Sequence, residues 1–274
     1  MYTVFGGSGF IGKEMVKYLK KIGCDCWAPN KYDESIYTKE LGTVIYAAGF
    51  GDCNKDPFNV FEANSVLLKN ILERCKFNKL IYISSTRVYM NNENSSVDSD
   101  VLIGQKDSRR LFNLTKLVSE ELCLLSKKNC TIVRPSNVYG LALNSVLFLP
   151  SIIRNAINDG VVNMYVEPDY AKDYVSVDDV VSSIYNISLL SENNNRIINL
   201  GSGNNVTAEK IANVLEEETN CHITWHGKTT ADEKFPVTDI SLTKEIIDYK
   251  PRSVLEDLVS MIADYKNDIS NNRI

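Results

Sequence analysis

The segment LFNLTK, residues 111–116, carries the aromatic ring of Phe112 one helical turn before Lys116. Two side chains at that spacing lie on the same face of a helix. A lysine there would lower the pKa of a neighbouring phenol by its positive charge, and so prepare a tyrosine to transfer a proton. Phe112 has no such proton to give. The segment is therefore either a catalytic helix without its acid or an ordinary amphipathic helix.

A glycine-rich turn near the N-terminus is a second candidate for chemistry. In YTVFGGSGFIG, residues 2–12, glycines separate a short apolar run from a helix-period segment. Glycine permits positive φ, close approach of a diphosphate and tight packing of the helix, whose first turn then faces the phosphates. The alternative is a plain tight turn. The pattern predicts a dinucleotide site with contacts from Gly6, Gly9, Phe10, Ile11 and Gly12.

The end of the second apolar run bears on which dinucleotide is bound. An acidic residue there holds the adenosine ribose, whereas a basic one accommodates a 2′-phosphate. The run CDCWAPNK ends in Asn30 and Lys31, so the sequence favours NADP(H) over NAD(H). The alternative is that Lys31 is a solvated surface charge.

Short apolar runs alternate with helix-period segments as far as residue 136, which indicates parallel strands joined by right-handed crossovers. The sequence predicts an α/β fold, a Rossmann-type doubly wound parallel sheet with a smaller C-terminal substrate lobe. Residues 1–140 plus 172–202 would form the dinucleotide-binding domain, and residues 141–171 plus 203–274 the lobe. Residues 32–43 are too few for an additional helix and edge strand, so the sheet is expected to have one strand fewer than related sheets.

Composition restricts the partners. A net charge of −5 argues against a nucleic-acid partner, because phosphate affinity needs clustered Lys and Arg. The seven scattered cysteines are typical of reduced thiols in a cytoplasmic protein, and no apolar run is long enough to span a membrane. His222 and His226 would project from one face of a strand, but no further ligands complete a metal site, so none is expected.

Several motifs in order resemble the extended short-chain dehydrogenase/reductase family, in its nucleotide-sugar epimerase, dehydratase and reductase branch. They are GGSGFIG, VIYAAG, ANSVLLKNILE, ISSTRVY, LFNLTK, RPSNVYG and KDYVSVDDVV. The resemblance implies that the nicotinamide cofactor is contacted by Ala47, Ala48, Gly49, Asn64 and Lys116. It implies that the nucleotide-sugar substrate is contacted by Ser85, Thr86, Arg87, Asn137 and Lys172.

The resemblance also implies roles for single residues. Ser85 would hydrogen-bond the oxygen of the reacting sugar carbon, and Lys116 would hold the nicotinamide ribose. Ser85, Phe112 and Lys116 together occupy the catalytic positions. Without the surrounding motifs, Ser85 is equally a strand-end cap, and Lys116 and Lys172 are equally solvated charges.

Departures from the family pattern reduce the number of reactions that the chain is expected to catalyse. Phe112 stands where the family has its proton-transferring tyrosine, which has three explanations: an engineered knockout, a natural enzyme that takes its proton from Ser85 or water, or a cofactor-binding protein without chemistry. Thr86 and Arg87 stand where a 4,6-dehydratase has an Asp-Glu pair, and the cysteine that combined epimerase-reductases have at position 87 is absent too.

These observations predict reduction of a 4-keto nucleotide sugar by hydride transfer to C4. A nucleotide-sugar 4-epimerase and a catalytically silent NADP-binding sensor are the alternatives. Members of the family dimerise through two helices, so a homodimer is expected, with Leu114, Leu117, Val118 and Leu122 on the contact face or in the core.

Overall fold

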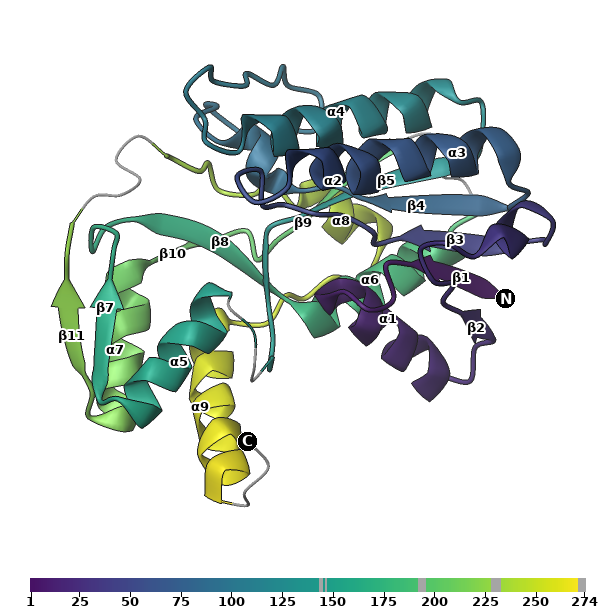
Figure 1. Cartoon of the computed structure of the whole chain (residues 1–274). Coiled ribbons are helices and arrows are strands. Elements are labelled where there is room, and N and C mark those ends of the chain that lie inside the picture. Colours follow the sequence, from purple (N-terminus) through teal and green to yellow (C-terminus); the bar gives the residue numbers. More distant parts are fainter. Residues whose placement is uncertain (143–144, 146, 192–195, 228–232, 271–274) are drawn as a thin grey trace.

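The computed structural model describes residues 1–142, 145, 147–191, 196–227 and 233–270. Its centre is a six-stranded sheet in the order β2-β1-β3-β4-β5-β9, in which every adjacent pair is parallel (Figure 1). The strands are β1 (Tyr2–Phe5), β2 (Cys26–Trp27), β3 (Thr43–Tyr46), β4 (Lys79–Ile83), β5 (Cys130–Pro135) and β9 (Arg196–Leu200). The strand order reverses between β1 and β3, and ligands bind at such a reversal in open α/β sheets.

Helices cover both faces of this sheet (Figure 1). One face carries α2 (Pro57–Phe61), the π-helical segment η2 (Glu62–Val66), α3 (Leu67–Arg74) and α4 (Arg110–Leu125). The other carries α1 (Phe10–Lys21), α6 (Val177–Leu189) and α8 (Ser241–Ile246). Because both faces are covered, β3 and β4 are buried along almost their whole length, as their continuous apolar runs predict. The prediction of a doubly wound α/β fold is confirmed.

The C-terminal lobe has its own core, at the left of Figure 1. A three-stranded sheet joins β6 (Asn137–Tyr139), β8 (Ala171–Ser176) and β10 (Asn205–Thr207), and a parallel pair joins β7 (Val161–Met164) and β11 (His222–Trp225). The lobe's helices are α5 (Phe148–Asn158), α7 (Ala208–Thr219) and α9 (Val254–Ser270). None of the helices in the described part of the chain has the length and apolar character of a membrane span.

Local differences from the sequence prediction have physical causes. Between β2 and β3 the chain forms only a short 3₁₀ helix, η1 (Glu34–Tyr37), so this connection adds no strand, as expected. Helix α2 begins at Pro57 because the Asp56 carboxylate caps it by accepting a hydrogen bond from the backbone N–H of Asn59. The short elements β6, β10 and α8 were not predicted, since three to six residues give no clear period.

A buried ion pair ties α4 to the sheet. Arg134 of β5 donates to both carboxylate oxygens of Glu120, from Nε at 2.9 Å and also from Nη2. Its Nη1 donates to the Tyr89 hydroxyl, and Ser84, directly after β4, donates to Glu120. Arg134 and Glu120 are 3% and 1% exposed, so neither charge has water as a substitute partner. The network fixes α4 against the carboxyl ends of β4 and β5.

Glu120→Ala is expected to lower the free energy of unfolding by about 3–5 kcal/mol, because it leaves the Arg134 guanidinium buried without its counter-charge. Denaturant unfolding followed by circular dichroism measures the change. Lys250→Ala, which removes one partner of an exposed ion pair with Asp248, is the control and should leave stability nearly unchanged. A loss at position 120 no larger than that of the control would contradict the assignment.

Candidate active site

The glycine turn packs directly against the end of β3, where the strand order reverses. Gly6 has φ of +79°, and a Cβ on it would lie 2.5 Å from the backbone N of Ala48. A Cβ on Gly12 would lie 2.1 Å from the Gly6 carbonyl oxygen, so neither position tolerates a side chain. This contact joins the turn to the loop after β3.

The N-terminus of α1 is free for an anion. Gly9 caps the helix without a side-chain hydrogen bond, and the first turn contains no acidic residue. The backbone N–H groups and the positive end of the helix dipole are therefore left for a phosphate. Phe10 and Ile11, which were also predicted to contact the dinucleotide, are the first two residues of this helix and are partly buried.

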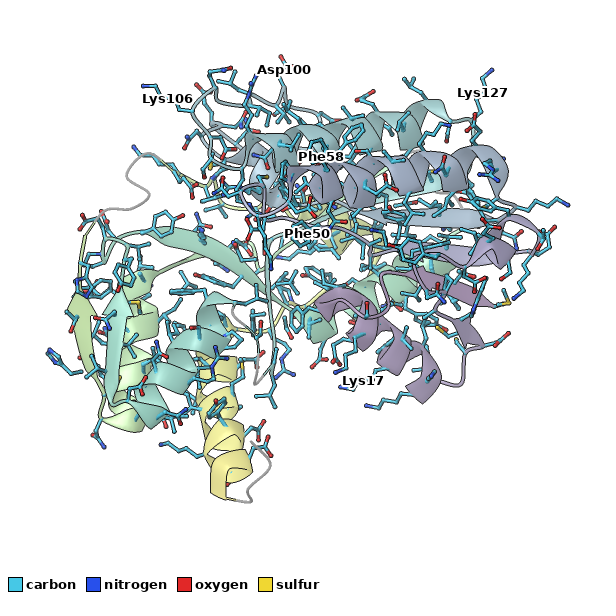
Figure 2. All side chains as sticks on the ribbon, viewed as in Figure 1. Lys17, Phe50, Phe58, Asp100, Lys106 and Lys127 are labelled. Atoms are coloured by element: carbon cyan, nitrogen blue, oxygen red, sulfur yellow. The ribbon has the colours of Figure 1, made fainter. Side chains whose placement is uncertain are left out.

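The loop after β3 meets Asn64 and Lys116. A Cβ on Gly49 would lie 3.1 Å from Asn64 Oδ1 and 3.5 Å from Lys116 Nζ. Asn64, which is fully buried in the π-helical segment, accepts a hydrogen bond from the backbone N–H of Phe50 and donates to the Phe50 carbonyl and to Thr115 Oγ1. Phe50 is labelled in Figure 2. A π-helical turn of this kind often marks a functional site. Here the side-chain amide of Asn64, which belongs to this turn, joins the loop after β3 to α4.

Lys116 is a buried cation at the carboxyl end of the sheet. Its Nζ donates to the Ile83 carbonyl at 2.9 Å and lies 5.7 Å from the centre of the Phe112 ring. Burial lowers the pKa of Lys116 to about 8, and the carboxylate of Glu120 opposes that shift. Lys116 and Phe112 therefore share one face of α4, directed toward the strand ends.

The chain turns sharply after β4 and brings three predicted residues to the same edge. Ser85 accepts a hydrogen bond at Oγ from the backbone N–H of Arg87, at 3.1 Å, and thereby caps the 3₁₀ helix η3 (Thr86–Tyr89). The Ser85 hydroxyl proton remains available to another acceptor. Thr86 is buried beside it. The strand-end cap and the chemical role expected of Ser85 are compatible, because they use different parts of one hydroxyl.

Arg87 is held by two carboxylates. Its Nη2 lies 2.9 Å from Asp107 Oδ1 and 2.9 Å from Glu233 Oε1. Glu233 also accepts a hydrogen bond from the Tyr170 hydroxyl. These ion pairs raise the pKa of Arg87 against the lowering effect of burial. A guanidinium at this position does not release a proton at neutral pH, so Arg87 cannot act as a general base.

A cavity of about 310 Å³ lies beside the site and extends into the C-terminal lobe. Asn137 and Lys172 line it, together with Phe10 from α1 and Tyr170. Lys172 Nζ lies 4.8 Å from the Tyr170 ring and 4.9 Å from the Phe235 ring, and burial lowers the pKa of Lys172 to about 8. The cavity thus combines apolar walls with a cation, as a nucleotide pocket does.

The predicted determinants of cofactor choice lie on the surface beside the glycine turn. A Cβ on Gly7 would lie 2.8 Å from Ala28 Cβ, which brings the end of β2 against the turn. Asn30 accepts a hydrogen bond from the backbone N–H of Tyr32, and Lys31 Nζ donates to Asn59 Oδ1 at 3.3 Å. Both side chains are exposed.

Sequence reasoning missed three charged residues of this region: Arg109, Asp107 and Glu233. The signal for Arg109 was present, since it precedes Phe112 by one turn. Glu233 gave no signal, because it follows β11 in a segment without periodicity. The histidines show no metal site: His226 hydrogen-bonds Asn163, and the described residues contain no group of His, Cys, Asp and Glu that could hold an ion.

The model of the NAD dependent epimerase/dehydratase family matches residues 2–201. The chain belongs to this family. The resemblance to the nucleotide-sugar branch of extended short-chain dehydrogenases/reductases is confirmed. The glycine turn, the open N-terminus of α1 and the loop joining Gly49 to Lys116 fit the dinucleotide that this family uses.

Individual relatives differ in their reactions. The chain is 22% identical to UDP-glucose 4-epimerase of Mycoplasma genitalium, over 94% of this chain and 85% of that protein. It is 24% identical to dTDP-4-dehydro-6-deoxyglucose reductase of Escherichia coli, over 93% of each. Both relatives act at nucleotide sugars, so the family assignment alone leaves the reaction open.

Solved structures share the fold. MoeE5 in complex with UDP-glucuronic acid and NAD has a TM-score of 0.84 at 17% identity, with 97% of this chain and 98% of that chain covered. RMD from Pseudomonas aeruginosa complexed with NADPH has a TM-score of 0.78 at 20% identity, with 97% and 99% covered. These likenesses confirm the Rossmann-type architecture.

The lowered pKa of Lys116 has a consequence for stability. Between pH 8 and about 10.5 the folded chain has released a proton at this position that the unfolded chain still holds. The stability of the native protein relative to Lys116→Met should therefore be constant below pH 8 and rise above it, by about 1.4 kcal/mol per pH unit. Denaturant unfolding of both proteins from pH 7 to 9.5 measures this difference. A difference that does not change with pH would show that Lys116 keeps an ordinary pKa, and one that falls with pH would show that folding raises that pKa.

Proposed function

We propose that the chain transfers hydride at C4 of a nucleotide-bound hexose, in the direction of 4-keto reduction, with NADP(H) favoured over NAD(H). The observation that carries this proposal is the meeting of Gly49, Asn64 and Lys116 at the carboxyl edge where the glycine turn opens. Ser85 and Phe112 belong to the same edge, on η3 and α4.

In this proposal each residue has a separate task. The bound nicotinamide supplies or accepts the hydride. The glycine turn holds the cofactor diphosphate through backbone N–H groups, and Lys116 holds its ribose. Ser85 donates its hydroxyl proton in a hydrogen bond to the sugar C4 oxygen, since its lone pair already accepts from Arg87. Asn137 and Lys172 hold the substrate diphosphate in the cavity.

Phe112 limits the proposed reaction. Proton transfer by a positioned side chain contributes about 10²–10⁴-fold to rate, and a phenyl ring contributes none of it. The intact network around Lys116 favours an active site that lacks one group, either by engineering or because Ser85 or water supplies the proton. A silent sensor would have no need for Ser85 and Lys116 in these positions.

A 4-epimerase is the second candidate. The epimerase of Mycoplasma genitalium and the NAD complex of MoeE5 favour it. The two reactions use the same residues and differ in whether the hydride returns to the same sugar. An epimerase interconverts its substrates without consuming added cofactor, so turnover with and without added NADPH separates them.

Phe112→Tyr is expected to raise turnover by about 10²–10⁴-fold, because it restores a proton donor beside Lys116. NADPH consumption with 4-keto-6-deoxy nucleotide sugars measures the reduction, and oxidation of nucleotide hexoses and uronates measures the reverse. Phe77→Tyr, outside the site, is the matched control. No gain over the phenylalanine protein across these substrates would reject the proposed reaction.

The proposed preference for NADP(H) depends on Lys31. Its ammonium is exposed beside the end of β2, donates to the Asn59 amide oxygen and lies 5.7 Å from the centre of the Tyr32 ring. Lys31→Gln should weaken NADPH binding about tenfold and leave NADH binding unchanged, as loss of one ionic contact to a phosphate requires. Calorimetric titration with both cofactors measures this. Equal effects on NADPH and NADH would contradict the role.

A homodimer is part of the proposal, and the outer face of α2 and α4 supports it. Leu114, Val118 and Leu125 are 38%, 49% and 75% exposed on α4, while Leu117 and Leu122 are partly buried. Phe58, labelled in Figure 2, is 86% exposed on the neighbouring α2. An apolar patch of this kind marks an interface.

A cytoplasmic setting is supported by the seven free cysteines.

Sedimentation should give twice the chain mass of 30.8 kDa for the native protein. Val118→Glu should give the monomer, because the carboxylate would be buried unpaired in the interface. Leu189→Glu, at an exposed position on α6, is the control. A monomeric native protein would contradict the dimer.

A further inference from the structure

The guanidinium of Arg109 lies beside Phe112 and has no salt-bridge partner among the described residues, although the carboxylates of Asp107 and Glu233 are near enough to favour its charged form. Its carbon lies 4.4 Å above the centre of the Phe112 ring, and its Nη2 lies 2.8 Å from where a Cβ on Gly51 would be. Neither an ion pair nor a hydrogen bond joins this guanidinium to the rest of the described chain, and its side chain is only partly exposed.

The neighbouring charges make this arrangement costly without a ligand. Burial and the positive charge of Arg87 lower the pKa of Arg109, and the carboxylates of Asp107 and Glu233 oppose this shift only in part. Arg87 forms ion pairs with both Asp107 and Glu233. The pKa of Lys172 is influenced by the charges of Glu233, Arg87 and Arg109, so Lys172 belongs to the same cluster. The cluster thus contains three cations and two carboxylates. A desolvated cation in such a cluster is stabilised when a further anion arrives.

The position of Arg109 identifies which part of the substrate would bring the anion. Lys172 lines the cavity that extends into the lobe, whereas Arg109 lies against the ring of Phe112 and is not part of the cavity wall. Position 112 adjoins the reacting carbon in the proposed reaction, so an anion on Arg109 would belong to the sugar. The N–H groups of a guanidinium form a planar fork, which suits a planar carboxylate with two hydrogen bonds.

We propose that Arg109 binds a carboxylate on the hexose, so that the chain acts on a nucleotide-bound uronic acid in preference to the matching neutral sugar. This inference rests on the proposed function. In a uronic acid the carboxylate is C6, which is joined to C5 and so lies two bonds from the reacting C4. Neutral hexoses and 6-deoxyhexoses are then the weaker ligands, because they bring no anion to form an ion pair with Arg109.

Calorimetric binding of matched sugar pairs tests the inference, with the native chain saturated with oxidised cofactor. The probes are UDP-glucuronate with UDP-glucose, and GDP-mannuronate with GDP-mannose. Within one pair, the native protein should bind the uronate more tightly. Arg109→Gln should weaken uronate binding about 10- to 100-fold and change binding of the neutral sugar less than twofold. Arg109→Lys keeps the positive charge but cannot form two parallel hydrogen bonds, so its uronate affinity should lie between those of the native protein and Arg109→Gln.

The matched control is Arg74→Gln, since Arg74 also stacks on a ring, 3.8 Å from the centre of Tyr37, but at the opposite end of the sheet. It should leave both affinities unchanged, and unchanged cofactor affinity in Arg109→Gln shows that the variant is folded. Equal loss for both sugars would mean that Arg109 binds the diphosphate, and would overturn the inference. No loss for either sugar, or no preference for a uronate in the native protein, would overturn it as well. Cofactor binding without binding of any nucleotide sugar would instead reject the proposed function itself.

Discussion

The burial of the Lys116 ammonium at the carboxyl edge of the sheet is the constraint on which the site depends. An ammonium removed from water is stable only where fixed partners replace the solvent. Lys116 has the Ile83 carbonyl as a direct partner, and the Glu120 carboxylate favours its charged form. Ile83 ends β4 two residues before Ser85, and Glu120 lies on α4. The burial of one charge therefore links β4 to α4 at the edge where Ser85 lies.

The anchoring of α4 follows from that requirement. The bidentate pair between Glu120 and Arg134 keeps the helix against β5, and the Asn64 amide holds its first half to the loop after β3. Ser119 adds a hydrogen bond to the Asn64 carbonyl. With the middle of the helix fixed, position 112 has a set place relative to the strand ends. Arg109 lies over the ring at that position, with its guanidinium carbon 4.4 Å from the ring centre.

Much of this architecture was accessible from the sequence. The glycine turn could be predicted because a position that tolerates no side chain must be glycine, and glycine is visible in the sequence. Gly6 and Gly12 are such positions, since a Cβ on either would clash with backbone atoms. The buried strands β3 and β4 were predicted because a sheet covered on both faces needs continuous apolar runs. Lys116 was found from its spacing to Phe112. These features depend on local or strictly periodic relations.

The parts that were missed depend on contacts between distant segments. Glu233 reaches Arg87 across 146 positions, and nothing near either residue indicates the pair. The role of Arg109 emerges only when Asp107 and Glu233 are seen to be engaged by Arg87, since a count of charges along the chain does not tell which are already paired. Cofactor preference is equally hard to predict, because the sequence around an exposed lysine does not tell whether that lysine binds a phosphate or only water.

A crystal structure of the chain with bound NADP⁺ tests the central claim most directly. The account predicts that the cofactor diphosphate lies over the turn from Gly6 to Gly12 and that the nicotinamide ribose hydroxyls accept or donate hydrogen bonds at Lys116 Nζ. The nicotinamide ring should then face Ser85 and the ring of Phe112. A cofactor bound elsewhere, or a ribose out of reach of Lys116, would contradict the assignment of this edge as the active site.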